Sequence, residues 1–169
     1  PRPGEDVSRV RIVAPKVKTL VRIEGGWKNP VRNLRLEGLV LTGTTTPCMN
    51  AGFGGADVPG ALEIRRAENC SFERLVIRHV GGTGVKASQS RGLRLSESSV
   101  TDCGSSALCI YVEDSEIVSN RLLRAGLAFP SAGLATLGQE RLCFARNEVA
   151  YAPYCGLILR GSGNLIEEN

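Results

Sequence analysis

The stretch "ALEIRRAENCSFERLVIRHVGGTGVKASQSRGLRLSESSVTDCGSSALCI", Ala61 to Ile110, decides the fold because its pattern returns every 23 residues. Small-then-apolar pairs open the successive copies: Ala61-Leu62, Gly84-Val85, Ala107-Leu108, Gly133-Leu134 and Gly156-Leu157. The spacings between these pairs are 23, 23, 26 and 23 residues. A fixed period of this kind is typical of solenoids, in which each repeat packs only on its neighbours.

A second register supports the first. Asn120, Asn147 and Asn169 each follow an apolar residue by three positions, and Ser98 and Leu75 hold the same place in earlier copies. This column predicts an asparagine ladder, whose amides hydrogen-bond from coil to coil at a sharp bend. "LEGLVL", residues 36–41, matches "FERLVI", residues 72–77, so an earlier copy precedes an inserted loop at 43–60.

Each repeat contains three short segments of alternating polarity joined by small or polar residues, which favours strands over helices. Three strands per coil predict an all-β, right-handed, single-stranded parallel β-helix of the pectate-lyase-like kind. We expect about 23 residues per coil and one domain over residues 1–169. Two inward columns are predicted: Leu62, Val85, Leu108, Leu134 and Leu157, then Ile64, Ala87, Ile110, Thr136 and Leu159.

Composition excludes several classes of protein. The net charge is only +4 and no Lys/Arg cluster is present, which argues against nucleic acid as a partner. No apolar run is long enough for a membrane span. The six cysteines form no CxxC pair, so we expect free thiols, with no metal and no cofactor. The chain starts without Met and ends partway around a coil, so we expect further β-helix coils or flanking domains of a longer chain.

Four versatile side chains share one corner of the predicted coils. His79, Asp102, Arg124 and Tyr151 each come two residues after the last inward apolar residue, and Gly43 takes this place in the earliest copy. Asp102 and His79 are the candidate catalytic pair, a tuned acid or base. Arg124 and Tyr151 are candidates for binding a sugar. The alternative is a structural corner in which Arg124 simply pairs with Asp102, and this is the more common arrangement in a solenoid.

The outward face of the first strand is the second candidate surface. Glu63, Lys86 and Tyr111 lie on this face and are candidate substrate-binding residues. Its mixture of charged and apolar groups suits a sugar polymer, although a covering segment would explain the apolar half equally well. Asp57, in the inserted loop, and Glu63 are candidates for a second carboxylate.

Five stretches carry a resemblance to a known family: "VAPKVKTLVRIEG", "VRNLRLEGLVLTGT", "GALEIRRAENCSFERLVIRHVGGTGV", "VTDCGSSAL" and "NEVAYAPYCGLILRGSGNLIEEN". They resemble bacterial right-handed parallel β-helix repeat proteins, in particular those similar to glycoside hydrolase family 141. The resemblance implies a secreted or periplasmic protein that hydrolyses polysaccharide or oligosaccharide with two carboxylates. Asp102 matches the family's aspartate-then-glycine turn, and His79, in "RHVGG", matches its histidine turn.

Two other functions stay open. A non-catalytic carbohydrate-binding or surface solenoid needs no second carboxylate. A polysaccharide lyase is the third candidate, although the acidic cluster that would hold the calcium ion of a pectate lyase is absent. The paired aspartates and Gly-His-Gly motif of polygalacturonases are absent too.

Overall fold

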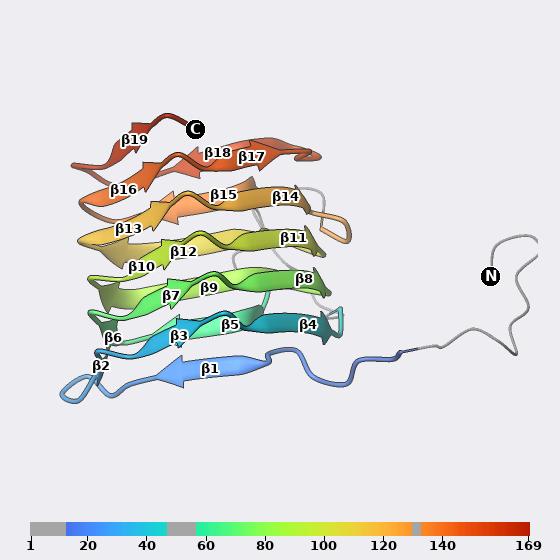
Figure 1. Cartoon of the computed structure of the whole chain (residues 1–169), viewed down its shortest axis with the longest axis horizontal. Helices are drawn as coiled ribbons and strands as arrows, with labels where there is room; N and C mark the ends of the chain where they lie inside the picture. The colour runs from blue at the N-terminus through green and yellow to red at the C-terminus, as the bar shows by residue number, and fades with distance from the viewer. Residues whose placement is uncertain (1–12, 47–56, 130–132) are drawn as a thin grey trace, which may run out of the picture.

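The computed structural model describes residues 13–46, 57–129 and 133–169. These residues form a parallel β-solenoid of about five turns, whose coils are stacked one on another from β1 to β19 (Figure 1). The all-β parallel fold and the period of about 23 residues are therefore confirmed. The right hand of the helix stays a prediction. No helix in the described ranges is long and apolar enough to span a membrane.

Three parallel sheets, here called A, B and C, make up the solenoid. Sheet A consists of β1 (Val21–Glu24), β5 (Gly60–Arg65), β9 (Thr83–Arg91), β12 (Leu108–Glu113), β15 (Gly133–Gly138) and β18 (Cys155–Leu159), with the short strands β2 (Val31–Arg32) and β6 (Ala67–Glu68) beside them. Sheet B consists of β3 (Arg35–Glu37), β7 (Ser71–Glu73), β10 (Arg94–Ser96), β13 (Ser115–Val118), β16 (Leu142–Ala145) and β19 (Leu165–Glu167). Sheet C consists of β4 (Val40–Thr44), β8 (Val76–Val80), β11 (Ser99–Cys103), β14 (Arg121–Ala125) and β17 (Glu148–Ala150).

The core is built from apolar residues at equivalent positions of successive coils. In sheet B, Phe72 pairs with Leu95, which in turn pairs with Ile117. Leu36 pairs with Phe72 as the sequence match predicts, although 36 residues separate them. Phe72 is 1% exposed and Phe144 is fully buried. Burial of such columns drives coil stacking because every added coil removes more apolar surface from water.

The predicted register is wrong by one residue in one coil. Leu108 pairs with Ala135 and Ile110 with Leu137, whereas Thr136 pairs with Cys109 on the outward face. The inserted segment before β15 is therefore one residue longer than the 26-residue spacing suggests. Leu134-Ala135 takes the place of Ala107-Leu108 with the order of small and large side chains reversed, and all four side chains are fully buried. The swap conserves core volume, which packing tolerates well.

The predicted asparagine ladder is confirmed. Asn120 Oδ1 accepts a hydrogen bond of 2.9 Å from the Ser98 backbone amide, and Asn147 Oδ1 accepts one of the same length from the Asn120 amide. Asn169 Oδ1 continues the column by accepting from the Asn147 amide at 2.9 Å. Asn120 is 1% exposed, so its side chain satisfies backbone groups that water does not reach.

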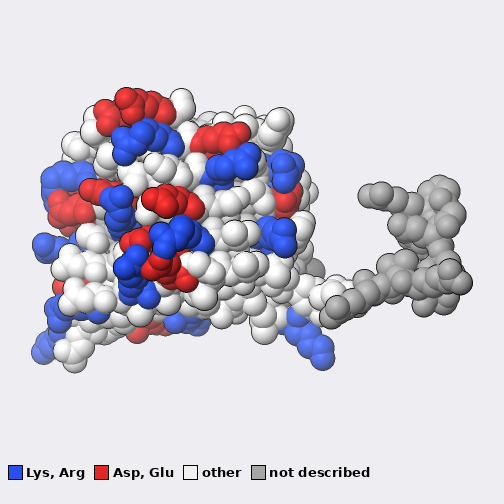
Figure 2. Space-filling view, viewed as in Figure 1, with Lys and Arg blue, Asp and Glu red and all other residues white. Residues whose placement is uncertain are grey.

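Charged side chains of both signs alternate on the face seen in Figure 2. Arg121 Nε lies 2.7 Å from Glu148, and Arg35 lies 2.8 Å from Glu73. Each of these pairs joins neighbouring coils. Exposed pairs contribute little to stability, but they favour the observed register over shifted ones.

Candidate functional site

The predicted column of His79, Asp102, Arg124 and Tyr151 exists as a corner of the solenoid. The neighbours of these residues pair across sheet C, which stacks the four on successive coils. All four adopt a left-handed backbone, with φ of 52°, 54°, 49° and 61°, and Gly43 does the same with φ of 77°. Histidine and aspartate tolerate this conformation better than most residues do. The backbone conformation of the corner therefore accounts for His79 and Asp102 in part, without a catalytic role.

Arg124 and Asp102 form a bidentate ion pair. Arg124 Nε donates to Asp102 Oδ1 at 2.6 Å, and Nη2 donates to Oδ2 at 3.0 Å. His79 Nε2 lies 4.0 Å from the same Oδ2. The hydrogen bond from Arg124 is the main reason that the pKa of Asp102 is lowered. Asp102 is consequently an ionised carboxylate at neutral pH, a poor proton donor and a weak base.

The predicted residues of the outward face of sheet A already have partners in the protein. Glu63 accepts a hydrogen bond from the Gly60 amide at 3.1 Å and pairs with Arg22 at 3.1 Å. Lys86 Nζ donates to the Val58 carbonyl at 3.2 Å. Tyr111 lies against Gly138, where an added Cβ would come within 2.7 Å of its ring.

The middle of this face is covered, whereas Ile158 at its last coil is half-buried. Cys109 and Thr136 are only 2% and 5% exposed, although both point away from the core. Burial is the main reason that the pKa of the Cys109 thiol is raised, and Asp57 adds to the effect by its charge. Asp57 therefore lies near Cys109. Residues 47–56 of the inserted loop fall outside the described ranges.

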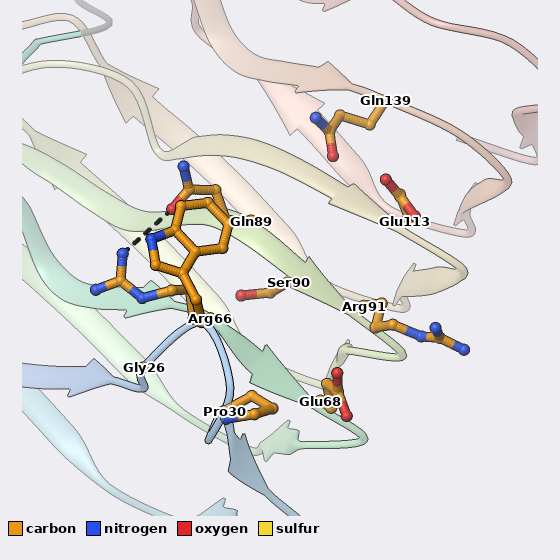
Figure 3. Close-up of a pocket in the computed structure, with 10 residues that line it drawn as sticks. Gly26, Pro30, Arg66, Glu68, Gln89, Ser90, Arg91, Glu113 and Gln139 are labelled. Atoms are coloured by element: carbon orange, nitrogen blue, oxygen red, sulfur yellow. Dashed lines mark hydrogen bonds between the residues drawn. The ribbon is translucent and has the colours of Figure 1, made fainter.

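A hollow of about 360 Å³ lies at a different corner, where the strands of sheet A end (Figure 3). It is here called the Trp27 hollow. Its walls come from the turn after β1 and from the ends of the strands of sheet A: Gly26, Trp27, Pro30, Arg66, Glu68, Gln89, Ser90, Arg91, Glu113 and Gln139. In Figure 3, Glu68 and Pro30 lie to one side of Gln89, and Glu113 and Gln139 lie to the other.

Trp27 stands at the tip of a tight turn. The Gly26 amide donates to the Asn29 carbonyl at 2.9 Å, and the Asn29 amide donates back to the Gly26 carbonyl at 3.2 Å. Trp27 is 77% exposed. Such exposure of the largest apolar side chain has a cost in water, which a ligand packed on the ring would remove.

Arg66 fastens this turn to the solenoid. Its guanidinium lies 5.5 Å from the centroid of the Trp27 ring, a cation–π distance. The same group donates to the Gly25 carbonyl, to Glu24 Oε1 at 2.7 Å and to Gln89 Oε1 at 3.4 Å. Gly25 is required because an added Cβ would lie 2.3 Å from the Arg66 carbonyl oxygen. The aromatic platform is therefore preorganised, which lowers the entropy lost on binding.

Apart from Gly26, Pro30 and Ser90, the other side chains that line the Trp27 hollow are planar polar groups. Glu68 accepts from Arg32 at 2.9 Å, and Gln89 accepts from Arg65 at 2.9 Å. Arg91, Glu113 and Gln139 are exposed. Each of these groups can form two hydrogen bonds with neighbouring hydroxyls of one ligand: a carboxylate accepts both, a guanidinium donates both, and an amide accepts one and donates one.

This hollow was missed from the sequence. The signal is Trp27, the single tryptophan, placed in "GGWKNP" between residues that favour turns. Arg66, Gln89 and Gln139 mark the same corner by their positive φ of 54°, 53° and 88°. A register read from apolar residues follows the core and does not align such exposed corner positions.

Within the described ranges, no group of three or more His, Cys, Asp or Glu side chains could hold a metal ion. No protein-family model, curated protein or solved structure matches the chain. The similarity to glycoside hydrolase family 141 therefore stays a prediction from the quoted motifs.

Proposed function

We propose that this protein is a carbohydrate-binding β-solenoid and that the Trp27 hollow holds the sugar. The observation that carries this proposal is an exposed indole, fixed beside a hollow that is also lined by carboxylate, amide and guanidinium groups. A pyranose ring has an apolar face of C–H groups and a rim of hydroxyls. An indole packs on the apolar face, and carboxylates, amides and guanidinium groups bind the rim.

Binding has better support than catalysis at Asp102. An acid catalyst must keep its proton near the working pH, which requires a raised pKa. The pairing of Asp102 with Arg124 acts in the opposite direction. Glycan binding needs no proton transfer, so it is compatible with an Asp102 that fixes the corner and with a site elsewhere.

The test is binding to a broad panel of glycans by wild type and two matched variants. Trp27→Ala removes the aromatic side chain of the Trp27 hollow. Tyr151→Ala removes a comparably exposed aromatic side chain, 73% against 77%, from the corner that contains Asp102. We expect Trp27→Ala to lose binding and Tyr151→Ala to keep it. The reverse result would move the site to the Asp102 corner, and an absence of binding to any glycan would overturn the proposal.

Hydrolysis of the bound glycan is the second candidate, favoured by two carboxylates in the same hollow. Glu68 and Glu113 are both register partners of Arg91, on opposite sides of it. Two coil steps separate their backbones by about 9.5 Å. Release of reducing ends that Glu113→Gln abolishes would support hydrolysis. Unsaturated products would indicate a lyase. If no product forms, the function is binding without catalysis.

A further inference from the structure

We propose that the ligand of the Trp27 hollow is an uncharged glycan chain of at least three sugar units that lies along the solenoid axis. This inference rests on the proposed function and narrows its ligand. Two properties of the hollow carry it, namely its extension across the coils and the balance of its charges.

The hollow crosses the strands instead of following one of them. Its walls come from five successive coils, with the turn of Trp27 on the first, Arg66 and Glu68 on the second, Arg91 on the third, Glu113 on the fourth and Gln139 on the fifth. Arg66 and Gln139 are thus three coil steps apart. Three coil steps amount to about 14 Å along the axis. A single sugar cannot reach from Arg66 to Gln139, but an extended chain with roughly one unit per coil can.

Trp27 lies at one end of the hollow. Its turn precedes β2, and β2 pairs with β6 in the coil that contains Arg66 and Glu68. The far end holds Gln139, an exposed amide that follows β15. The first sugar unit therefore packs on the indole, and later units meet Arg91, Glu113 and Gln139. Loss of Trp27 should weaken chains of every length, and loss of Gln139 should weaken only long chains.

The charges in the hollow cancel. Its walls hold two arginines, Arg66 and Arg91, and two glutamates, Glu68 and Glu113. Glu24 engages Arg66 and Arg32 engages Glu68. Arg91 lies between Glu68 and Glu113 on the neighbouring coils.

A carboxylate on the ligand that approached Arg91 would therefore meet a glutamate on each side. Hydroxyl groups meet no such repulsion, and they can donate to Glu113 and accept from Arg91. The hollow accordingly selects a neutral sugar over a uronic acid.

The experiment is calorimetry on the glycans of the panel, each as a series of one to six units, with neutral and uronic acid chains of the same lengths. Wild type, Trp27→Ala and Gln139→Ala are compared. Glu97→Ala is the control, because Glu97 is also exposed with a positive φ but lies at the corner between sheets B and C. We expect affinity to rise by about tenfold or more from one unit to three and then to level off. Gln139→Ala should lose that rise, whereas Glu97→Ala should keep it.

Three results would overturn the inference and leave the proposed function standing. They are equal affinity for one unit and three, an unchanged length dependence in Gln139→Ala, and tighter binding of the uronic acid chains. Failure of every glycan to bind would instead overturn the proposed function, and the inference with it.

Discussion

Arg124 donates hydrogen bonds to both carboxylate oxygens of Asp102, at 2.6 and 3.0 Å, although 22 residues separate Asp102 from Arg124 in the chain. One coil brings them together, because Thr101 and Leu123, which precede them in the chain, are paired across sheet C. The left-handed backbone of each residue directs both side chains outward along the same edge. The residue with the strongest sequence case for catalysis is thus held by a neighbour of opposite charge.

The first prediction concerns the pKa of Asp102, which this ion pair should lower. Its pKa should lie below the ordinary 3.8, mainly because of the hydrogen bond from Arg124. A lowered folded-state pKa gives stability that is fully present above the unfolded pKa, near 3.8, and is lost as pH falls through the folded value. Carboxyl carbon chemical shifts measured by NMR against pH would report the midpoint, and Arg124→Met should raise it. A midpoint at or above 3.8 in the folded wild type would contradict the pairing.

The asparagine ladder predicts a graded loss of stability. Asn120 donates to the Leu95 and Val118 carbonyls, both at 3.0 Å, and accepts from the Ser98 amide. Asn120→Ala leaves that buried amide without a partner and should lower the free energy of unfolding by about 2–3 kcal/mol.

Asn120→Ser is the matched control. Ser98 Oγ, one coil earlier, accepts from the Leu75 amide at 3.0 Å, so a serine can fill this position. Urea denaturation should show a smaller loss for serine than for alanine. Equal losses would mean that the hydrogen bond to Ser98 contributes nothing measurable.

Two glycines of one column predict opposite outcomes. A Cβ at Gly84 would lie 2.3 Å from Val100 Cγ1 and 2.6 Å from the Ala107 carbonyl oxygen, so Gly84→Ala should cost about 3 kcal/mol. At Gly156 the nearest atom, Val149 Cγ1, is 3.8 Å away, so Gly156→Ala should change stability by less than about 1 kcal/mol. Thermal and urea unfolding of the two variants would check this, and similar losses would contradict the packing described at Gly84.

Cysteine reactivity tests the closed core. Cys103 is fully buried, and this burial is the main reason that its pKa is raised to about 12. Because the thiolate is the reactive form, iodoacetamide at pH 8 should spare Cys103 in the folded protein. Cys143 and Cys155 are partly exposed and should react before Cys103, as followed by mass spectrometry. Labelling of Cys103 at the rate of Cys143 would show that the coils open readily.

The sequence was sufficient for the parts of the fold that repeat. The register of strand pairing can be predicted from apolar columns such as Leu36, Phe72 and Leu95, because each of these residues must face the same core. The register failed where Gly133-Leu134 imitates the small-then-apolar pair one residue too early. Local pattern alone cannot distinguish it from the true Leu134-Ala135 alignment, in which only the total core volume is conserved.

The candidate site was less accessible from the sequence. The column of His79, Asp102 and Arg124 follows from the repeat, but whether Asp102 carries a proton depends on a side-chain contact across coils. Trp27 lies in a turn outside the repeat, and no periodicity points to it. Its significance comes from Arg66 and from the hollow beside it, which require three-dimensional coordinates.

The fluorescence of Trp27 is the most direct test of glycan binding in the Trp27 hollow, because the chain has no other tryptophan. Titration with neutral glycan chains of three or more units should shift the emission to shorter wavelength and saturate, since the sugar removes water from the exposed indole. Uronic acid chains should produce a weaker change at the same concentrations. Emission that stays constant while calorimetry records glycan binding would place the sugar away from Trp27 and contradict the account.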